Sequence, residues 1–296
     1  MKKLFKILAY VALVLVLAIG AHLYYLTTLA AKETYPEDTY LAHVENKNAL
    51  IIVAHDDDMI GSSGTIATLC KNGWDIREMC FYQNGGLYAK KDSMKNPIRK
   101  KDLQRVADIQ GLSGVDPVDF TFRNNTRSEE SYMPMPYDKF AENFKIDSLT
   151  KIIAAYIEKN KPTVIFTLDS EMGGYGHPDH VLVSKIVLEY CQAHKSDSGF
   201  SVKKIYQAVF TPTLSERVMR NMPVYAAAKK VYQRDGMPFP DVQFNITANA
   251  ALKKECMQAY TTEQNSLRQI WPYYHWYPAS VYFGIFDRDF FRVIEI

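Results

Sequence analysis

Hydrophobic residues occur along this chain in two patterns: one long N-terminal block, and a series of short runs separated by polar segments. The short runs are rich in β-branched residues and show little polar alternation, which is typical of strands buried on both faces of a parallel sheet. We expect strands at Asn48–Ala54, Ile76–Tyr82, Val118–Phe122, Thr163–Thr167 and Lys203–Phe210.

Segments with the apolar spacing of helices lie between these runs, at Thr65–Cys70, Arg99–Leu112, Leu149–Ile157 and Val181–Tyr190. Strands that alternate with helices predict an α/β fold, here a Rossmann-like, mostly parallel sheet with helices on both faces. After Phe210 the pattern becomes irregular. The aromatic-rich stretch Trp271–Phe291 is expected to form a hairpin or a packing layer, and a sugar-stacking wall or a membrane-facing surface is the alternative.

The N-terminal block runs from Ile7 to Leu26, is apolar apart from His22, and is long enough to cross a bilayer. Lysines precede it and the pair Tyr24-Tyr25 lies near its end, which favours a cytoplasmic N-terminus and a single-pass anchor with the following domain outside the cytoplasm. Cleavage as a signal peptide near Gly20, with release of the protein, is the alternative.

The chain therefore divides into three predicted parts: residues 1–31 as the anchor or signal segment, residues 32–47 as a polar tether, and residues 48–296 as one α/β domain. The formal net charge is only +2, and Lys and Arg are scattered, so nucleic acid is not an expected partner. The four cysteines show no Cys-x-x-Cys spacing and are expected to be buried thiols. Composition leaves the oligomeric state open.

Candidate chemistry is concentrated after two of the predicted strands. The run His55-Asp56-Asp57-Asp58 follows the first, and a Gly-rich segment ending in His177-Pro178-Asp179-His180 follows Thr163–Thr167. The carboxyl ends of parallel strands share one edge of a sheet. Histidine and carboxylate ligands are typical of a catalytic zinc ion that keeps one position for water. Either cluster alone is more often a solvated turn, but the two together favour a metal site.

These motifs resemble those of the LmbE-like or PIG-L-like deacetylases, zinc enzymes that remove N-acetyl groups from glucosamine-containing conjugates. The family's Ala-His-Pro-Asp-Asp-Glu motif appears in altered form at Ala54–Met59, and its His-Pro-Asp-His motif is intact at His177–His180. Weaker agreements are Asn84-Gly85-Gly86, Arg99 with Asp102, and Lys254 with Tyr260 and Gln264. The resemblance spans about residues 48–270.

The resemblance implies a role for each matching residue. His55, Asp58 and His180 would be the metal ligands, and Asp57 the general base that takes a proton from the attacking water. The implied metal is zinc (Zn2+), with iron (Fe2+) as the alternative.

The remaining roles follow from the same comparison. His177 and Tyr175 would face the developing oxyanion, and Asp179 would orient a ligand imidazole. Arg99 and Asn84 would contact the substrate.

Two positions depart from the family pattern: Asp56 replaces the usual proline, and Met59 replaces the usual glutamate. Three consecutive aspartates therefore follow His55, and the assignment of base and ligand could slip by one residue. Asp56 is expected either to compete for the metal or to change its affinity.

The resemblance implies a zinc-dependent hydrolase that removes an N-acetyl group from an N-acetylglucosamine-containing glycolipid, glycan or glycoside by metal-activated water. The alternatives are an amidase acting on a thiol conjugate or an antibiotic-type amide, and a noncatalytic membrane-anchored sugar-binding protein. The expected partners are a small-molecule, glycan or glycolipid substrate and the membrane. The side of the membrane stays open, because anchored members of the glycolipid-anchor pathway work on the cytosolic face.

Overall fold

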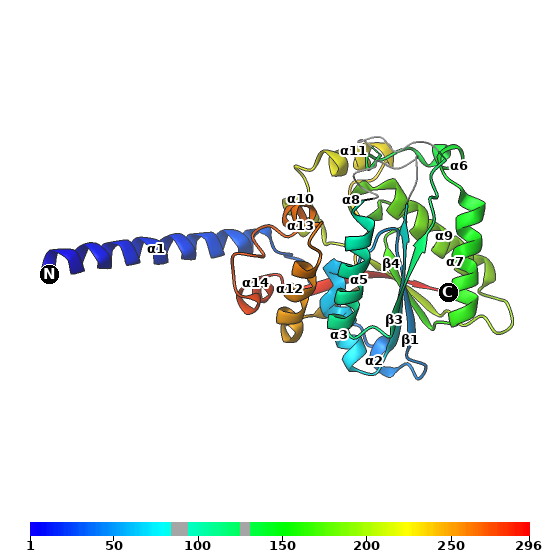
Figure 1. Ribbon diagram of the computed structural model, residues 1–296, viewed down its shortest axis with the longest axis horizontal. Helices are drawn as coiled ribbons and strands as arrows, with labels where there is room; N and C mark the ends of the chain where they lie inside the picture. The colour runs from blue at the N-terminus through cyan, green and yellow to red at the C-terminus, as the bar shows by residue number, and fades with distance from the viewer. Residues whose placement is uncertain (84–93, 125–130) are drawn as a thin grey trace.

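The computed structural model describes residues 1–83, 94–124 and 131–296 (Figure 1). Within this part of the chain a seven-stranded sheet has the order β3-β2-β1-β4-β5-β7-β6. Its strands are β1 (Asn48–Ile52), β2 (Asp75–Tyr82), β3 (Gly114–Asp119), β4 (Val164–Leu168), β5 (Lys204–Ala208), β6 (Val242–Asn245) and β7 (Arg288–Glu295). Strands β1 to β5 are parallel, whereas β7 is antiparallel to both β5 and β6. The predicted mostly parallel α/β fold is confirmed.

Helices cover both faces of the sheet (Figure 1). Helices α7 (Ile146–Asn160) and α9 (Pro178–His194) lie on one face, and α3 (Ser63–Lys71), α5 (Asn96–Gln110) and α12 (Ala250–Ala259) lie on the other. The other helices are α1 (Lys2–Leu29), α2 (Tyr40–His43), α6 (Phe140–Asn143), α8 (Gly173–Gly176), α10 (Pro212–Val218), α11 (Pro223–Val231), α13 (Gln264–Ile270) and α14 (Ala279–Ile285).

The first strand shows why its apolar run is continuous. Leu50 and Ile52 pack into the core on the α7 and α9 side, while Ala49, Ile51 and Val53 pack into the core on the α3 and α5 side. Successive side chains point to opposite faces, and both faces are covered. Every position of the run is therefore buried.

The structure differs from the sequence-based expectations in two elements. β3 begins at Gly114, earlier than the predicted Val118, and contains Pro117 paired opposite Cys80. A proline is tolerated there because β3 is the edge strand. Trp271–Phe291 is not a hairpin: it contains α14 and the start of β7, and it packs around α12.

The N-terminal helix α1 projects from the domain, and it is long and apolar enough to cross a membrane (Figure 1). Its large apolar side chains from Leu4 to Ile19 are exposed, whereas Leu26 and Leu29 are buried against the domain. The segment after it also follows the domain surface, because the carbonyl of Pro36 accepts from Gln243 N–H at 2.9 Å and Asp38 accepts from the Tyr206 hydroxyl at 2.7 Å.

Candidate metal and active site

The two motifs meet where the chain reverses its direction of winding in the sheet. β1 and β4 are neighbours, but the chain continues from β1 to β2 on one side and from β4 to β5 on the other. The loops that leave the two strands diverge, which opens the crevice typical of ligand sites in such sheets. A cavity of about 830 Å³ lies there and is lined by residues of both motifs, including His55, Asp58 and His180.

The three predicted metal ligands converge in this cavity. His55 Nδ1 lies 2.9 Å from His180 Nε2, His180 Nε2 lies 3.1 Å from Asp58 Oδ1, and His55 Nδ1 lies 3.6 Å from the same oxygen. Ligands placed about 2.1 Å from a tetrahedral zinc ion lie about 3.4 Å from one another. Two imidazole nitrogens and one carboxylate oxygen with this spacing fit a divalent metal.

A polar group on the far side of each ring, a carbonyl for His180 and an ion-paired carboxylate for His55, sets which nitrogen faces the centre. His180 Nδ1 lies 3.0 Å from the carbonyl oxygen of Gly173, so Nδ1 carries the hydrogen and Nε2 is left to donate a lone pair. His55 Nε2 lies 3.5 Å from Asp179 Oδ2, which leaves its Nδ1 for the centre. Asp58 uses Oδ2 to accept from the His55 backbone N–H at 2.9 Å and keeps Oδ1 for the centre.

Electrostatics favour an ionised carboxylate and a basic imidazole in this group. Burial would raise the pKa of Asp58, but His180 and His55 hold it below its ordinary value. Burial would lower the pKa of His55, but Asp58 and Asp179 outweigh that effect and raise the pKa to about 9. The metal-free site therefore holds a proton at neutral pH that a metal would displace.

A buried aspartate shapes the loop that presents His180. Asp169 accepts from the backbone N–H groups of Met172 and Gly174, both at 2.6 Å. Gly173 has φ +57°, and a Cβ there would lie 2.7 Å from the Cβ of His180. Only glycine fits, because both the backbone conformation and the close approach exclude a side chain.

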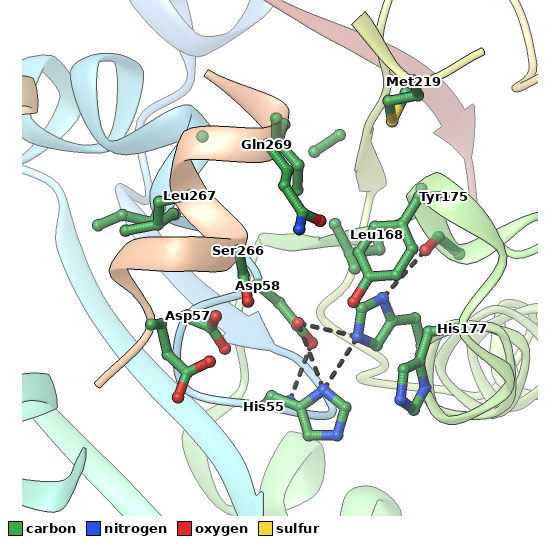
Figure 2. A pocket seen from close by; sticks show the side chains of 18 of the residues that line it. His55, Asp57, Asp58, Leu168, Tyr175, His177, Met219, Ser266, Leu267 and Gln269 are labelled. Carbon is green, nitrogen blue, oxygen red and sulfur yellow. Dashed lines mark hydrogen bonds and ion pairs between the residues drawn. The ribbon is translucent and has the colours of Figure 1, made fainter. Parts of the chain in front are cut away.

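His177 and Tyr175 lie beside the ligand group (Figure 2). His177 begins α9 as its N-cap and accepts the Asp179 backbone N–H on Nδ1 at 3.1 Å, so its Nε2 carries the hydrogen. Burial holds the pKa of His177 well below its usual range, so the ring is a neutral donor. Tyr175 places its ring 5.3 Å from the ring of His180, edge to face.

The ring nitrogens of His177 also lie close to those of His55 and His180, since one nitrogen from each ring falls within 4.8 Å of the other two. A three-histidine site is therefore the geometric alternative to the set with Asp58. The hydrogen on His177 Nε2 and the shorter contacts of Asp58 favour the set with Asp58.

Asp179 is held by two side chains that sequence reasoning missed. Arg123 forms a buried ion pair with Asp179 Oδ1, and Gln83 Nε2 donates to Oδ2 at 2.9 Å. Burial would raise the pKa of Asp179, but Arg123 and His177 hold it well below its usual range. The ionised carboxylate beside His55 is thus fixed in orientation. Its position just after β2 was the one feature of the sequence that could have identified Gln83.

Asp56 does not point into the ligand group. Its carboxylate is buried and accepts from the Tyr82 hydroxyl at 2.7 Å and from Arg99 Nε at 2.8 Å. The expectation that Asp56 competes for the metal is therefore wrong in this geometry, because its oxygens already have partners elsewhere. The assignment counted from His55 is favoured.

Arg99 contacts three carboxylates at the wall of the cavity. Besides Asp56, its guanidinium lies 2.7 Å from Asp57 Oδ1 and 3.0 Å from Glu263 Oε1. Asp57 is thereby fixed next to the ligand group, on the side of the cavity formed by α13 (Figure 2). The substrate contact predicted for Arg99 stays a prediction, and Asn84 lies outside the described residues.

Residues of the weaker sequence agreements contact the first motif and the segment that packs against it. The Tyr260 hydroxyl donates to the backbone carbonyl of Asp56, and Gln264 Nε2 donates to the Tyr260 carbonyl at 2.8 Å. Asp102 accepts from the Thr261 N–H at 2.9 Å. These residues hold the segment between α12 and α13 against the site.

Residues 50–191 match the family described as PIG-L, GlcNAc-PI de-N-acetylase, and the matched segment contains both motifs. Over these residues the chain is similar to the PIG-L family. It is also 32% identical over 128 residues to the 1D-myo-inositol 2-acetamido-2-deoxy-alpha-D-glucopyranoside deacetylase of Rhodococcus jostii (strain RHA1). That match covers 40% of this chain and 44% of the relative, so the chain spans less than half of the relative's length.

Solved structures share the fold of this domain. The N,N'-diacetylchitobiose deacetylase of Pyrococcus horikoshii is 17% identical with a TM-score of 0.51, covering 86% of this chain and 88% of that chain. The A40926 pseudoaglycone deacetylase is 14% identical with a TM-score of 0.53, covering 85% and 98%. GalB, the 4-carboxy-2-hydroxymuconate hydratase of Pseudomonas putida KT2440, is 14% identical with a TM-score of 0.54, covering 84% and 96%. Because a hydratase shares the fold, the fold alone does not fix the reaction.

The segment that matches the PIG-L family ends at residue 191, inside α9. It therefore includes His55, Asp58 and His180, but not the opposite wall of the cavity, which includes Met219, Trp271 and other residues of the C-terminal third. The chemistry of the site and the shape of its substrate cavity thus come from different parts of the chain.

Proposed function

We propose that the protein is a metal-dependent deacetylase that hydrolyses the amide of an N-acetylglucosamine-type group. The observation that carries the proposal is the triangle of His55 Nδ1, His180 Nε2 and Asp58 Oδ1, with Asp57 fixed beside it. These residues all lie within residues 50–191, the segment that matches the PIG-L family.

His55, Asp58 and His180 would hold the ion, and zinc suits this donor set, with iron(II) as the alternative. A bound metal would supply Lewis acidity toward the amide carbonyl and would make water more acidic. Asp179 keeps the His55 ring oriented, and the Gly173 carbonyl does the same for His180.

Asp57 is the proposed general base. Arg99 contacts one carboxylate oxygen of Asp57, which fixes the carboxylate and leaves the other oxygen to take a proton from the attacking water. The protonated Asp57 would then return that proton to the leaving amine. Attack by water forms a new C–O bond, and the amide C–N bond then breaks to give acetate and a free amino group.

His177 and Tyr175 are the proposed oxyanion donors. His177 is neutral and carries its hydrogen on Nε2, so it can donate to the negative charge that develops on the carbonyl oxygen. Tyr175 lies against the same group of rings, and its hydroxyl is the second proposed donor.

The proposed substrate carries N-acetylglucosamine as a glycolipid, glycan or glycoside. The names of the Rhodococcus relative and of the Pyrococcus structural neighbour both refer to an N-acetylated glucosamine unit. An amidase acting on another conjugate is the second candidate, because the far wall of the cavity includes apolar side chains such as Phe210, Met219 and Trp271.

We also propose that α1 is a single membrane-spanning anchor. Its exposed apolar surface supports this role, and the lysines at its start favour a domain outside the cytoplasm.

The test is acetate release by the full chain in detergent from a panel of N,N'-diacetylchitobiose and inositol-linked and lipid-linked N-acetylglucosaminides. The matched control is Asp57→Asn, which keeps the size of the side chain and an oxygen for Arg99 but removes the base. We expect release from at least one substrate and a loss of about 100-fold or more in kcat in the variant. Unchanged kcat in Asp57→Asn would refute the assigned base, and bound metal without release from any substrate would favour the other amidase.

A further inference from the structure

The last turns of α1 are joined to the domain by aromatic contacts. His22 Nδ1 lies 2.6 Å from the Tyr277 hydroxyl, and the His22 ring contacts the ring of Tyr273 edge to face at 4.6 Å. The same ring stacks on Trp276 at 5.5 Å. Together with the buried Leu26, these contacts hold the end of α1 against the domain, so the helix is not joined to it by a flexible linker.

Where α1 leaves the domain, large aromatic side chains face outward. Trp276 is 61% exposed, Tyr24 is 73% exposed and Tyr25 is 45% exposed. Tyr273 and Tyr277 are half-buried beside them. We name these residues the aromatic face: Tyr24, Tyr25, Tyr273, Trp276 and Tyr277.

The geometry of α1 places the aromatic face at one boundary of a bilayer. From Lys6 to Tyr24 the helix rises about 27 Å, at about 1.5 Å per residue. That rise is close to the hydrocarbon thickness of a bilayer, about 30 Å. Lysines therefore lie at one boundary and the aromatic face at the other, which is where tyrosine and tryptophan are enriched in membrane proteins.

Basic side chains lie at the same level. Lys32 Nζ and Arg217 Nη1 donate to carbonyls of the last turn of α1, those of Thr27 and Thr28. Lys254 Nζ donates to the carbonyl of Tyr277. Cations at this level suit lipid phosphates, and they would repel one another across an interface with a second copy of the chain.

We propose that the aromatic face docks in the headgroup region of a lipid bilayer, so that the domain lies on the membrane surface at a fixed orientation. The proposal rests on α1 crossing the membrane, but it does not depend on the deacetylase reaction. It also bears on substrate access, because Ile270 and Trp271, which line the cavity, directly precede the aromatic residues 273–277 in the chain. A cavity wall fixed next to the headgroups favours substrates that are themselves attached to lipid.

The three tryptophans allow a direct test (Trp74, Trp271 and Trp276). Trp74 and Trp271 are 4% and 3% exposed, so Trp276 is the one that lipid can reach. The full chain is reconstituted into phosphatidylcholine vesicles with or without bromine on the acyl chains, and tryptophan fluorescence is measured. Bromine close to the headgroup should quench more strongly than bromine close to the bilayer centre.

Two matched variants identify the quenched residue. Trp276→Phe should remove most of the quenching, whereas Trp74→Phe should leave the quenched signal in place. Equal quenching in the Trp276→Phe variant would overturn the proposal. Trp276 emission that brominated lipid does not change would also overturn it, even if a second copy of the chain were found to cover the aromatic face. Asp57→Asn should be quenched like the parent chain, so failure of the catalytic proposal would be distinguishable from failure of this one.

Discussion

At the residue scale, the site depends on which atom each side chain presents to its centre. His180 is oriented by a backbone carbonyl and His55 by Asp179. Each partner lies on the side of the ring opposite to the proposed metal, which fixes the orientation of the ring before a metal arrives. Preorganisation of this kind means that the ligands do not need to be rebuilt on binding.

Metal affinity should depend on pH through His55. The neighbouring carboxylates raise the pKa of this ring to about 9, so at lower pH a proton must leave Nδ1 before metal binds. We expect the apparent affinity to rise about tenfold per pH unit between about pH 6.5 and pH 8.5. Competition with a chromogenic chelator measures it, and Asp179→Asn should flatten the slope. An affinity that does not change with pH would contradict the assigned protonation.

Asp56 should matter for stability and not for metal binding. Asp56→Ala leaves the buried side of the Arg99 guanidinium without one of its partners, and we expect a loss of about 3 kcal/mol in the free energy of unfolding. The control Tyr82→Phe removes only the neutral donor to the same carboxylate and should cost about 1 kcal/mol. Urea unfolding gives both values. A drop in metal content of Asp56→Ala without a loss of stability would instead make Asp56 a ligand.

The sequence predicted the converging residues of both motifs but not their supports. His55, Asp57 and Asp58 lie just after β1, and His180 lies on α9, the helix that leads away from β4, so their meeting place could be inferred from sheet topology. Arg123 could not be identified, because it reaches Asp179 from the loop after an edge strand. The ion pairs of Arg99 were also missed, since they depend on how α5 and α13 pack and not on spacing along the chain.

At the scale of elements, the loop between β4 and α9 is constrained both in its backbone conformation and in the space around it. Gly173→Ala would strain a backbone with φ +57° and would place a Cβ 2.7 Å from both the His180 Cβ and the Val181 nitrogen. We expect loss of bound metal together with a loss of more than about 2 kcal/mol in stability. The matched control is Gly199→Ala, which has φ +82° but open space around the new Cβ.

Metal analysis and urea unfolding of the two variants distinguish backbone strain at a positive φ from the steric clash of the new Cβ with His180 and Val181. Gly199→Ala should cost only about 1 kcal/mol and keep its metal. Full metal content in Gly173→Ala would contradict the role given to this loop in presenting His180.

Most elements up to β5 were predictable, and the later ones were not. The runs that became β1 and β4 are largely apolar because both of their faces are covered. β2 and β5 are also largely buried but include polar residues such as Glu78 and Gln207. The region after β5 forms several short helices, of which α10 and α13 have seven residues each, so no periodic pattern develops. The end of the chain returns to the sheet as β7, antiparallel to β5, a long-range pairing with no local signal.

At the scale of the whole molecule, the C-terminal third closes the site that the first two thirds build. Tyr260 binds the backbone of the first motif, and Glu263 completes the group of carboxylates around Arg99. The same third contacts α1 through its aromatic residues. The proposed anchor, the wall of the cavity and the support of the proposed base are therefore parts of one packed unit.

The central claim is that His55, Asp58 and His180 hold the metal on which amide hydrolysis depends. The most direct test is acetate release by the chelator-treated full chain during titration with zinc, on the substrate found in the panel. We expect that release disappears on chelation and returns to its full value at about one zinc per chain, and that His180→Ala does not recover. Release that persists in the chelated protein, or that recovers equally in His180→Ala, would contradict it.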